Sequence, residues 1–290
     1  MVAPKLIDSH CHLQFQAYRE DAPKVIEEAL HGGTWPVVVG TQSTTSAAAV
    51  ELANRYPQGV YAAVGLHPNH LHQMEFDEDE LPVKTRAESF DADYYAGLAK
   101  NSKVVAIGEC GLDFYRLPAD IAREEVITLQ KEQFRVQLNF ADAHDLPVII
   151  HCRDAHKEIL EILTEYIGNK KLPRRGVIHS FTAGWPVAGA YLDLGFYLGF
   201  NGIITFPPRK GAESSQAELI ETVKNTPADK FLFETDAPYL SPVPERGRRN
   251  HPNYIAHVAG KAAQIRGVAA GELAAQSVQN AQTLFYRLKI

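Results

Sequence analysis

The chain has 290 residues, a formal net charge of −6, and a composition of 45% hydrophobic and 22% charged residues. This length suits one α/β barrel, which typically needs about 250 residues. The acidic balance argues against a broad basic surface for tight, nonspecific duplex binding, but it allows a phosphate substrate in a locally basic cleft. We expect residues 1–290 to form a single domain.

The sequence carries no signal for export or membrane insertion. Its start lacks the charged and apolar regions of a signal peptide, and no apolar run approaches the roughly 18 residues of a membrane span. The three cysteines have no paired spacing, which fits small buried side chains in a reducing compartment. We therefore expect an intracellular protein, cytoplasmic or nuclear, with no membrane role.

Short strand-like runs alternate with helical segments along the chain. Several runs are continuously apolar, such as residues 37–39 and 148–150, as strands covered on both faces should be. The predicted strands are Lys5–Asp8, Pro36–Gly40, Tyr61–Val64, Val104–Gly108, Val148–His151, Gly176–His179, Phe196–Leu198 and Phe231–Glu234. Repeated strand–helix units imply parallel strands with right-handed crossovers. Their number favours the α/β class and a closed (β/α)8 TIM barrel.

Helix signals lie between these strands. Asp21 precedes a helix with Pro23 in its first turn, and Ser43 or Thr44 precedes an Ala-rich helix. The Glu124–His144 stretch has an apolar face that should pack on the sheet, and Gly271–Leu288 predicts a C-terminal helix.

Two segments look irregular. Residues His70–Asp93 contain the acidic run Glu75–Glu80, which is typical of a solvated loop and helix start. Residues Ser241–Asn253 are too rich in Pro, Gly and Arg for regular structure, so we expect a long loop after the eighth strand.

The first predicted strand ends in the motif Asp8-Ser9-His10-Cys11-His12. Because side chains alternate along a strand, Asp8, His10 and His12 should share one face. Two imidazoles then converge, and neutral imidazole is a good ligand for Zn, Mn, Fe or Co. We expect Asp8 to orient a ligand rather than to bind metal itself.

Further histidines and carboxylates recur where later strands end, and in a barrel these ends open at one mouth. The predicted metal ligands are His10, His12, Glu109, His151, His179 and Asp236. Such a set of imidazoles and carboxylates suits a pair of divalent ions. Histidines in helical or loop positions, His70 and His156 among them, are expected to take no part.

These motifs resemble those of the TatD family of metal-dependent hydrolases, within the amidohydrolase-like barrels. The matching segments run from residue 8 to about 253 and are Asp8–His12, Gly65–Pro68, Gly108–Asp113, Gln130 with Gln137-Leu138, His151–Ala155, His179–Phe181, Gly202–Phe206, Glu234–Leu240, and Arg246-Gly247 with Asn250. Asn69, where a histidine is common, and Asn201, where a serine is common, depart from the pattern. Neither departure removes a ligand.

The resemblance implies a nuclease-type phosphodiesterase, often a 3′–5′ exonuclease, whose substrate is DNA with single strands or 3′ ends. It also implies two divalent ions, which Zn, Mg or Mn could supply, with Glu109 bridging them. Such ions can acidify a water and neutralise the oxygens of an in-line phosphoryl displacement. Asp236 is the best placed proton acceptor, so Glu109 and Asp236 are the predicted catalytic residues. We expect water to be the nucleophile, because no Ser or Cys at a strand end has a suitable base.

The mouth should also bind the phosphate through protein groups. The predicted substrate-binding residues are His67, Asp113, Arg153, Arg246 and Asn250. Arg153 follows His151 by two residues and could fork onto phosphate oxygens, or else pair with a loop carboxylate. Phe114, Tyr115 and Tyr239 can stack on a base or simply pack.

Two other functions stay open. The same site could hydrolyse a small-molecule amide or ester, because fold and ligands do not discriminate between these bonds. The chain could instead serve mainly as a partner in a protein complex, with Glu75–Glu80 as a contact surface. The arginines of the mouth favour phosphate, and the intact ligand set favours an enzyme.

Overall fold

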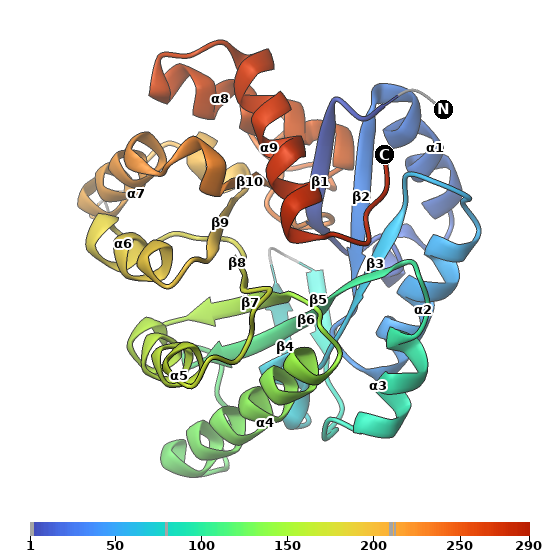
Figure 1. The fold of residues 1–290 in the computed structure, drawn as a ribbon, viewed down its shortest axis with the longest axis vertical. Helices are drawn as coiled ribbons and strands as arrows, with labels where there is room; N and C mark the ends of the chain where they lie inside the picture. The colour runs from blue at the N-terminus through green and yellow to red at the C-terminus, as the bar shows by residue number, and fades with distance from the viewer. Residues whose placement is uncertain (1–2, 79–80, 209–210, 212) are drawn as a thin grey trace.

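The computed structural model describes residues 3–78, 81–208, 211 and 213–290 (Figure 1). In these residues, eight parallel strands form one sheet in the order β1-β2-β3-β6-β7-β8-β9-β10, which curls into a nearly closed barrel inside a ring of helices. The strands are β1 Leu6–Cys11, β2 Thr34–Val39, β3 Tyr61–Val64, β6 Val104–Asp113, β7 Val148–Arg153, β8 Gly176–Ile178, β9 Tyr197–Phe200 and β10 Phe231–Phe233. The predicted (β/α)8 TIM barrel is confirmed. Each predicted strand is present, although β6 continues past Glu109 to Asp113.

Helices follow the strands as the sequence predicts. They are α1 Ala22–Gly32, α2 Ser43–Asn54, α3 Ala92–Ala99, α4 Arg123–Ala143, α5 His156–Gly168, α6 Trp185–Asp193, α7 Glu213–Asn225, α8 Ile255–Arg266 and the C-terminal α9 Ala270–Leu284. Among the described residues, no helix is long and apolar enough to cross a membrane.

The first and last strands meet where the barrel closes. Cys11 forms an isolated parallel bridge with Ala237, and the Asp236 N–H donates to the His10 carbonyl over 2.8 Å. The His12 N–H donates to the Ala237 carbonyl over 2.7 Å. Motifs more than 220 residues apart therefore lie side by side.

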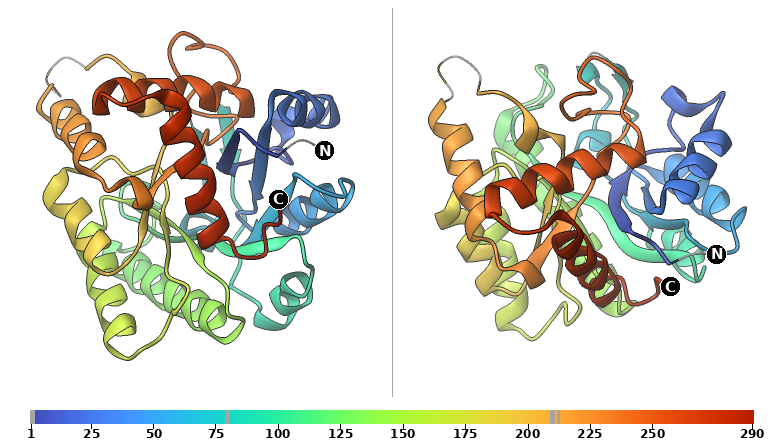
Figure 2. Two further views of the ribbon diagram at one scale, coloured as in Figure 1. Left: turned by 45° about the horizontal axis from the view of Figure 1, so that its top comes forward. Right: turned by 90° about the horizontal axis from the view of Figure 1, so that it is seen from above.

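Strand alternation separates an inner core from an outer one. Val37 and Val39 face the barrel interior, whereas Val38 packs outward against the helices. The interior cluster reaches α9 and the segment after it through Leu284 and Phe285. In Figure 2, α9 is the dark red helix that lies against this end of the barrel. The end where the strands begin is thus filled with apolar side chains, each contributing about 1.5–3 kcal/mol when fully buried.

The segment 70–93 differs from the prediction of a loop and helix start. Residues Glu75–Glu78 (β4) and Leu81–Lys84 (β5) form an antiparallel hairpin, followed by α3. The Thr85 N–H donates to the Met74 carbonyl over 2.9 Å and fixes the base of this hairpin. Backbone pairing with β5 therefore makes β4 a strand, although its acidic composition predicted a solvated loop. Asp79 and Glu80, the end of the acidic run, lie outside the described residues.

The segment after β10 fits the prediction of a long loop. Residues 241–251 contain neither helix nor strand, and the short 3-10 turn Pro252–Tyr254 precedes α8.

Candidate metal centre

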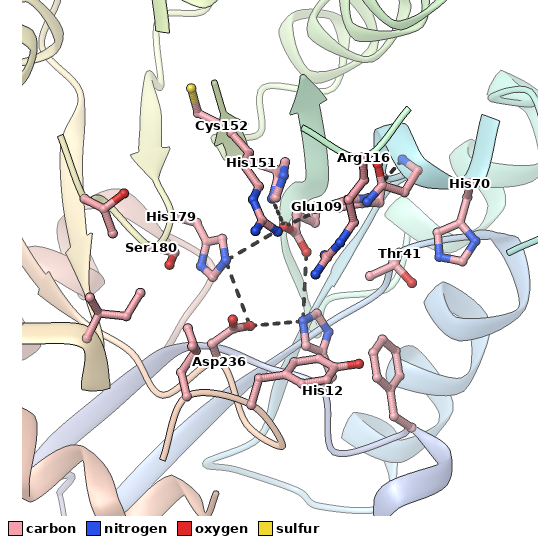
Figure 3. A pocket seen from close by; sticks show the side chains of 18 residues that line it. His12, Thr41, His70, Glu109, Arg116, His151, Cys152, His179, Ser180 and Asp236 are labelled. Carbon is pink, nitrogen blue, oxygen red and sulfur yellow. Dashed lines mark hydrogen bonds and ion pairs between the residues drawn. The ribbon is translucent and has the colours of Figure 1, made fainter. Parts of the chain in front are cut away.

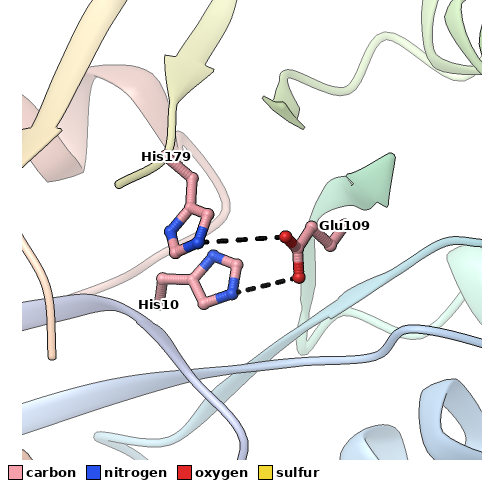
Figure 4. Close-up of side chains that lie close together, drawn as sticks. All are labelled: His10, Glu109 and His179. Atoms are coloured by element: carbon pink, nitrogen blue, oxygen red, sulfur yellow. Dashed lines mark ion pairs between the residues drawn. The ribbon is translucent and has the colours of Figure 1, made fainter. Parts of the chain in front are cut away.

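An imidazole on β1 and one that follows β8 stack and face one carboxylate. The His10 and His179 rings lie 3.5 Å apart between centroids, at an interplanar angle of 18°. Their Nε2 atoms lie 3.4 Å and 3.8 Å from the two Glu109 carboxylate oxygens, as Figure 4 shows. Glu109 is 4% exposed, so its charge has little access to solvent.

His12, Asp236 and His151 complete the cluster (Figure 3). His12 Nε2 lies 3.1 Å from His10 Nε2 and 3.4 Å from Asp236 Oδ1. His151 Nδ1 lies 3.0 Å from Glu109 Oε1. The structure thus brings all six predicted ligands into one cluster at the carboxyl end of the barrel.

The contacts of the ring nitrogens that point away from the cluster, in His12 and His179, indicate that this donor set fits a divalent cation. His12 Nδ1 donates to the Val39 carbonyl over 2.8 Å, and His179 Nδ1 lies 2.8 Å from Glu234 Oε1. In a neutral ring with its proton there, the other nitrogen presents a lone pair to the cluster. Together with two carboxylates, these lone pairs form a mixed N/O ligand set of the kind that Zn or Mn accepts.

The imidazoles around them keep both carboxylates ionised. Burial opposes the charged form of Glu109, but the His67 and His10 rings outweigh it and hold the pKa of Glu109 well below its usual range. Burial likewise opposes ionisation of Asp236, and His179 is the main group that lowers its pKa. Two ionised carboxylates therefore face the imidazoles at neutral pH.

The carboxylates act back on two of the rings. Burial lowers the pKa of His151, but hydrogen bonds to Asp113 and Glu109 raise it to about 9. Burial opposes protonation of His179 too, and the charge of Glu234 is the largest factor that raises its pKa to about 10. In the protein without a cation, protons on these rings balance the carboxylates.

His67 has a different role from the six clustered residues. Its Nε2 lies 3.5 Å from Glu109 Oε1, near His151. However, its Nδ1 accepts a hydrogen bond from the Asn69 N–H over 3.1 Å. Burial and the His151 ring lower the pKa of His67 well below its usual range, so the ring is neutral with its proton on Nε2. His67 Nε2 therefore presents an N–H toward Glu109 rather than a lone pair toward the cluster.

The loop that carries Asp236 is fixed by two buried polar residues. Asp8 accepts hydrogen bonds from the Thr235 N–H over 2.8 Å and from its hydroxyl over 2.6 Å. The Asn250 amide donates to the carbonyls of Thr235 and Tyr239 over 2.9 Å and 2.6 Å. Asp236 itself adopts a left-handed conformation with φ of 58°, which turns the chain sharply after β10.

These contacts revise two expectations. Asn250 is not among the residues that line the central cavity, because its amide holds backbone carbonyls behind Asp236. In addition, a register shift between Asp8 and Cys11 interrupts the regular alternation that would place Asp8 on the same face as His10. Asp8 nevertheless holds the backbone at Thr235 and at His10, since it also accepts from the His10 N–H over 3.3 Å.

Asp113 contacts His151 instead of lining the cavity. Its Oδ2 lies 3.2 Å from His151 Nε2, opposite the nitrogen that faces Glu109. Asn69, which departs from the family pattern, donates to the same Oδ2 over 3.3 Å. Asp113 thus fixes the His151 ring, as a carboxylate behind a metal-binding histidine commonly does.

Two buried glutamines on α4 anchor the loops of the site. Gln130 exchanges two hydrogen bonds of 2.9 Å with the backbone of Asp113, and Gln137 exchanges bonds of 2.8 Å and 2.9 Å with the backbone of Leu66. Residues seven apart lie on one helix face. We did not predict this role, although polar residues on a face expected to pack on the sheet signal it.

The cluster lies in a cavity of about 480 Å³ whose wall includes groups beyond the ligands. Arg153 lines it as predicted, and Arg116 lines it without having been predicted. His70 also lines the wall, and burial lowers its pKa to about 4, so it is neutral. Ser180 and Thr182 add hydroxyls to the wall.

Cys152 lines the same cavity but is poorly suited to be a nucleophile. Its Sγ lies 3.1 Å from His156 Nδ1 and 3.9 Å from the Tyr191 hydroxyl. Burial raises the pKa of this thiol to about 12 and lowers the pKa of His156. The thiol therefore stays protonated at neutral pH, in agreement with the expectation that water attacks.

Arg246, a predicted substrate-binding residue, does not line the central cavity. Its guanidinium carbon lies 4.1 Å from the centre of the Phe206 ring. Phe206 lines a neighbouring apolar cleft that shares Thr182 and Ile203 with the central cavity. Arg246 thus lies beside this side cleft rather than at the metal cluster.

Comparison with known proteins identifies the family. The protein-family model described as TatD related DNase matches residues 7–286. This chain belongs to the TatD family. The resemblance proposed from the motifs is thereby confirmed.

Individual TatD relatives match over nearly the whole chain. The uncharacterized metal-dependent hydrolase YabD of Bacillus subtilis (strain 168) is 36% identical over 283 residues, which cover 97% of this chain and 98% of YabD. The 3′-5′ ssDNA/RNA exonuclease TatD of Erwinia tasmaniensis is 34% identical over 285 residues, which cover 97% of this chain and 99% of that protein. The crystal structure of YJJV, a TatD homolog from Escherichia coli K12, superimposes with a TM-score of 0.79 at 28% identity, covering 97% of this chain and 98% of YJJV. The chain is therefore a TatD-family metal-dependent hydrolase.

Proposed function

We propose that this protein hydrolyses phosphodiester bonds of nucleic acid, as a 3′–5′ exonuclease that acts on single-stranded DNA. One observation carries the proposal: a buried cluster of imidazoles and carboxylates lies in a cavity that Arg116 and Arg153 also line. Permanently charged guanidiniums bind the negatively charged oxygens of a phosphodiester, whereas a neutral amide or lactone carries no such charge. The name of the Erwinia tasmaniensis relative supports the same substrate class.

The ligand geometry suggests how two divalent ions would be held. His10, His12, Glu109, His151, His179 and Asp236 would hold the ions, since Glu109 lies between His10 on one side and His151 on the other. Bound there, the ions would acidify a water and neutralise charge on the oxygens of the phosphodiester.

The remaining roles fall to the chain's own groups. Asp236 is ionised at neutral pH and would accept the proton of the attacking water. The His67 N–H and the Arg153 guanidinium would hold phosphate oxygens in the cavity. Asp113 and Glu234 would keep the rings of His151 and His179 aimed at the cluster.

A substrate panel tests this proposal. Purified protein is stripped with a chelator, supplied with Mg²⁺, Mn²⁺ or Zn²⁺, and incubated with 5′-labelled and 3′-labelled single-stranded DNA, RNA, duplex DNA, amides and lactones. The proposal predicts stepwise shortening of 5′-labelled single strands and early release of the 3′ label. Hydrolysis of an amide or lactone with no cleavage of any oligonucleotide would contradict it.

A further inference from the structure

An exposed aromatic ring contacts one of the residues that line the cavity. Tyr115 follows β6 and is 62% exposed, the largest value among the exposed large hydrophobic side chains in the described part of the chain. Single exposed apolar residues are common and need no explanation alone. Tyr115 differs from other exposed apolar residues because hydrogen bonds fix its backbone and because it contacts a residue of the cavity wall.

The backbone of Tyr115 is tied to the metal centre. Its N–H donates to Asp113 Oδ1 over 3.0 Å, and the other oxygen of that carboxylate lies 3.2 Å from His151 Nε2. The preceding Phe114 is buried, and its N–H donates to the Arg153 carbonyl over 2.9 Å. The position of the ring is therefore set relative to His151 by two adjacent strands, β6 and β7.

Arg153 links the ring to the cavity. Its guanidinium carbon lies 4.0 Å from the centre of the Tyr115 ring, and the same residue lines the cavity. With the guanidinium against one face, an exposure of 62% leaves the opposite face of the ring open to solvent. A cation on one face and an open face on the other match a flat π system attached to a phosphate.

Building on the proposed function, we propose that Tyr115 and Arg153 form a stacking platform for a nucleobase of the bound strand, outside the cavity that takes the scissile phosphate. The base lies on the open face of Tyr115, and Arg153 remains between this base and the phosphate in the cavity. In a duplex, neighbouring base pairs cover the base faces, so the platform selects single strands.

The chain provides a matched control for this platform. Tyr286 is 37% exposed, and the Arg174 guanidinium carbon lies 4.2 Å from its ring centre. Tyr286 follows α9, which packs at the other end of the barrel, and it does not line the cavity. It thus presents a similar ring and guanidinium without the metal centre.

The experiment compares Y115A, Y115L, Y115F and Y286A with the unchanged protein. The substrates are a single-stranded oligonucleotide, the same strand with an abasic site at each position in turn, and bis(p-nitrophenyl) phosphate, which has no nucleobase. The first measurement is the ratio of kcat/KM for the oligonucleotide to kcat/KM for the small ester. The second is equilibrium binding of the labelled oligonucleotide in chelator.

We expect this ratio to fall roughly 10-fold in Y115A and Y115L through a higher KM, because base stacking on an aromatic ring contributes on that scale. Y115F and Y286A should keep the ratio. In the unchanged protein, one abasic position should lower the ratio as much as Y115A does. In Y115A, the same abasic position should cause no further decrease, since the base and the ring are then partners.

The two proposals fail in different ways. An unchanged ratio in Y115A, or purely additive effects at every abasic position, would overturn the platform while the nuclease activity stands. No hydrolysis of any phosphodiester by the unchanged protein, with oligonucleotide binding still dependent on Tyr115, would overturn the proposed function and support the platform.

Discussion

The two ends of the barrel are built from the same strands but carry opposite chemistry. Where the strands begin, Ile7, Val37 and Leu232 pack with Phe285 from the C-terminal segment in an apolar core. Where they end, His10 and Glu109 are equally buried, but they face other ionisable groups rather than apolar side chains. Buried charge near the mouth costs stability, and the apolar end offsets that cost.

The apolar end therefore provides stability, and the end with the ionisable cluster provides the chemistry. Changes at the mouth should reduce hydrolysis and metal binding with little loss of stability. Changes at the closed end should do the reverse.

The largest effect is expected for Glu109→Gln, which removes the carboxylate that faces His10, His151 and His179. We predict a fall in kcat of about 10³-fold, the scale for loss of one preorganised electrostatic group in an active site. The check is phosphodiester hydrolysis at saturating metal, with thermal unfolding recorded alongside. Retained turnover would show that the cluster is not the active site.

At the closed end, Phe285→Ala should destabilise the protein by about 3–5 kcal/mol, the cost of emptying a buried aromatic site. Phe285 is fully buried in the interior cluster, which contains none of the six predicted ligands. Denaturant unfolding measures the loss, and hydrolysis below the unfolding transition should keep its kcat. A fall in kcat without a loss of stability would break the separation between the two ends.

A smaller effect is expected for Asp113→Asn, which weakens the support behind His151. Loss of such a carboxylate typically lowers metal affinity about 10–100-fold, and calorimetric titration of the stripped protein measures it. Asp145→Asn is the control, since Asp145 pairs with Arg174 on an exposed surface. Equal metal affinities in both variants would mean that Asp113 does not orient a ligand.

The smallest effect is a dependence of stability on pH in the metal-free protein. The pKa values of His151 and His179 are raised to about 9 and about 10 in the folded state. Their stabilising contribution is therefore complete below the unfolded value of 6.5 and is lost as pH rises toward 10. Unfolding should become easier from pH 6.5 to 10 in chelator. Metal binding near pH 7 should release protons, visible as a buffer-dependent enthalpy. A flat stability profile and no proton release would contradict these assignments.

The sequence supported the prediction of the barrel and the cluster because both depend on local signals. Apolar runs marked the strands, and each polar residue just after a run marked the mouth, as with His179 after β8 and Asp236 after β10. The hairpin of β4 and β5 was missed because its pairing competes with an acidic composition that favours solvent. No such conflict affected β7 or β10.

Side-chain direction was the harder part, since it depends on partners distant in sequence. Asp113 and Asn250 were expected to face substrate, but Asp113 faces His151 and Asn250 faces the carbonyls of the Asp236 loop. Arg116 was missed because it lies beyond the end of β6, where chain direction no longer follows from strand alternation. That residues 1–290 form one domain, and where the protein resides in the cell, stay predictions.

The most direct test of the central claim follows metal and hydrolysis in one titration. Stripped protein receives increasing Mn²⁺ or Zn²⁺, and bound metal and the rate of single-stranded DNA cleavage are measured at each step. We predict no cleavage in the stripped protein and a rate that rises with occupancy to a plateau at two ions per chain. Full cleavage before any metal is added, or full occupancy without cleavage, would contradict the account.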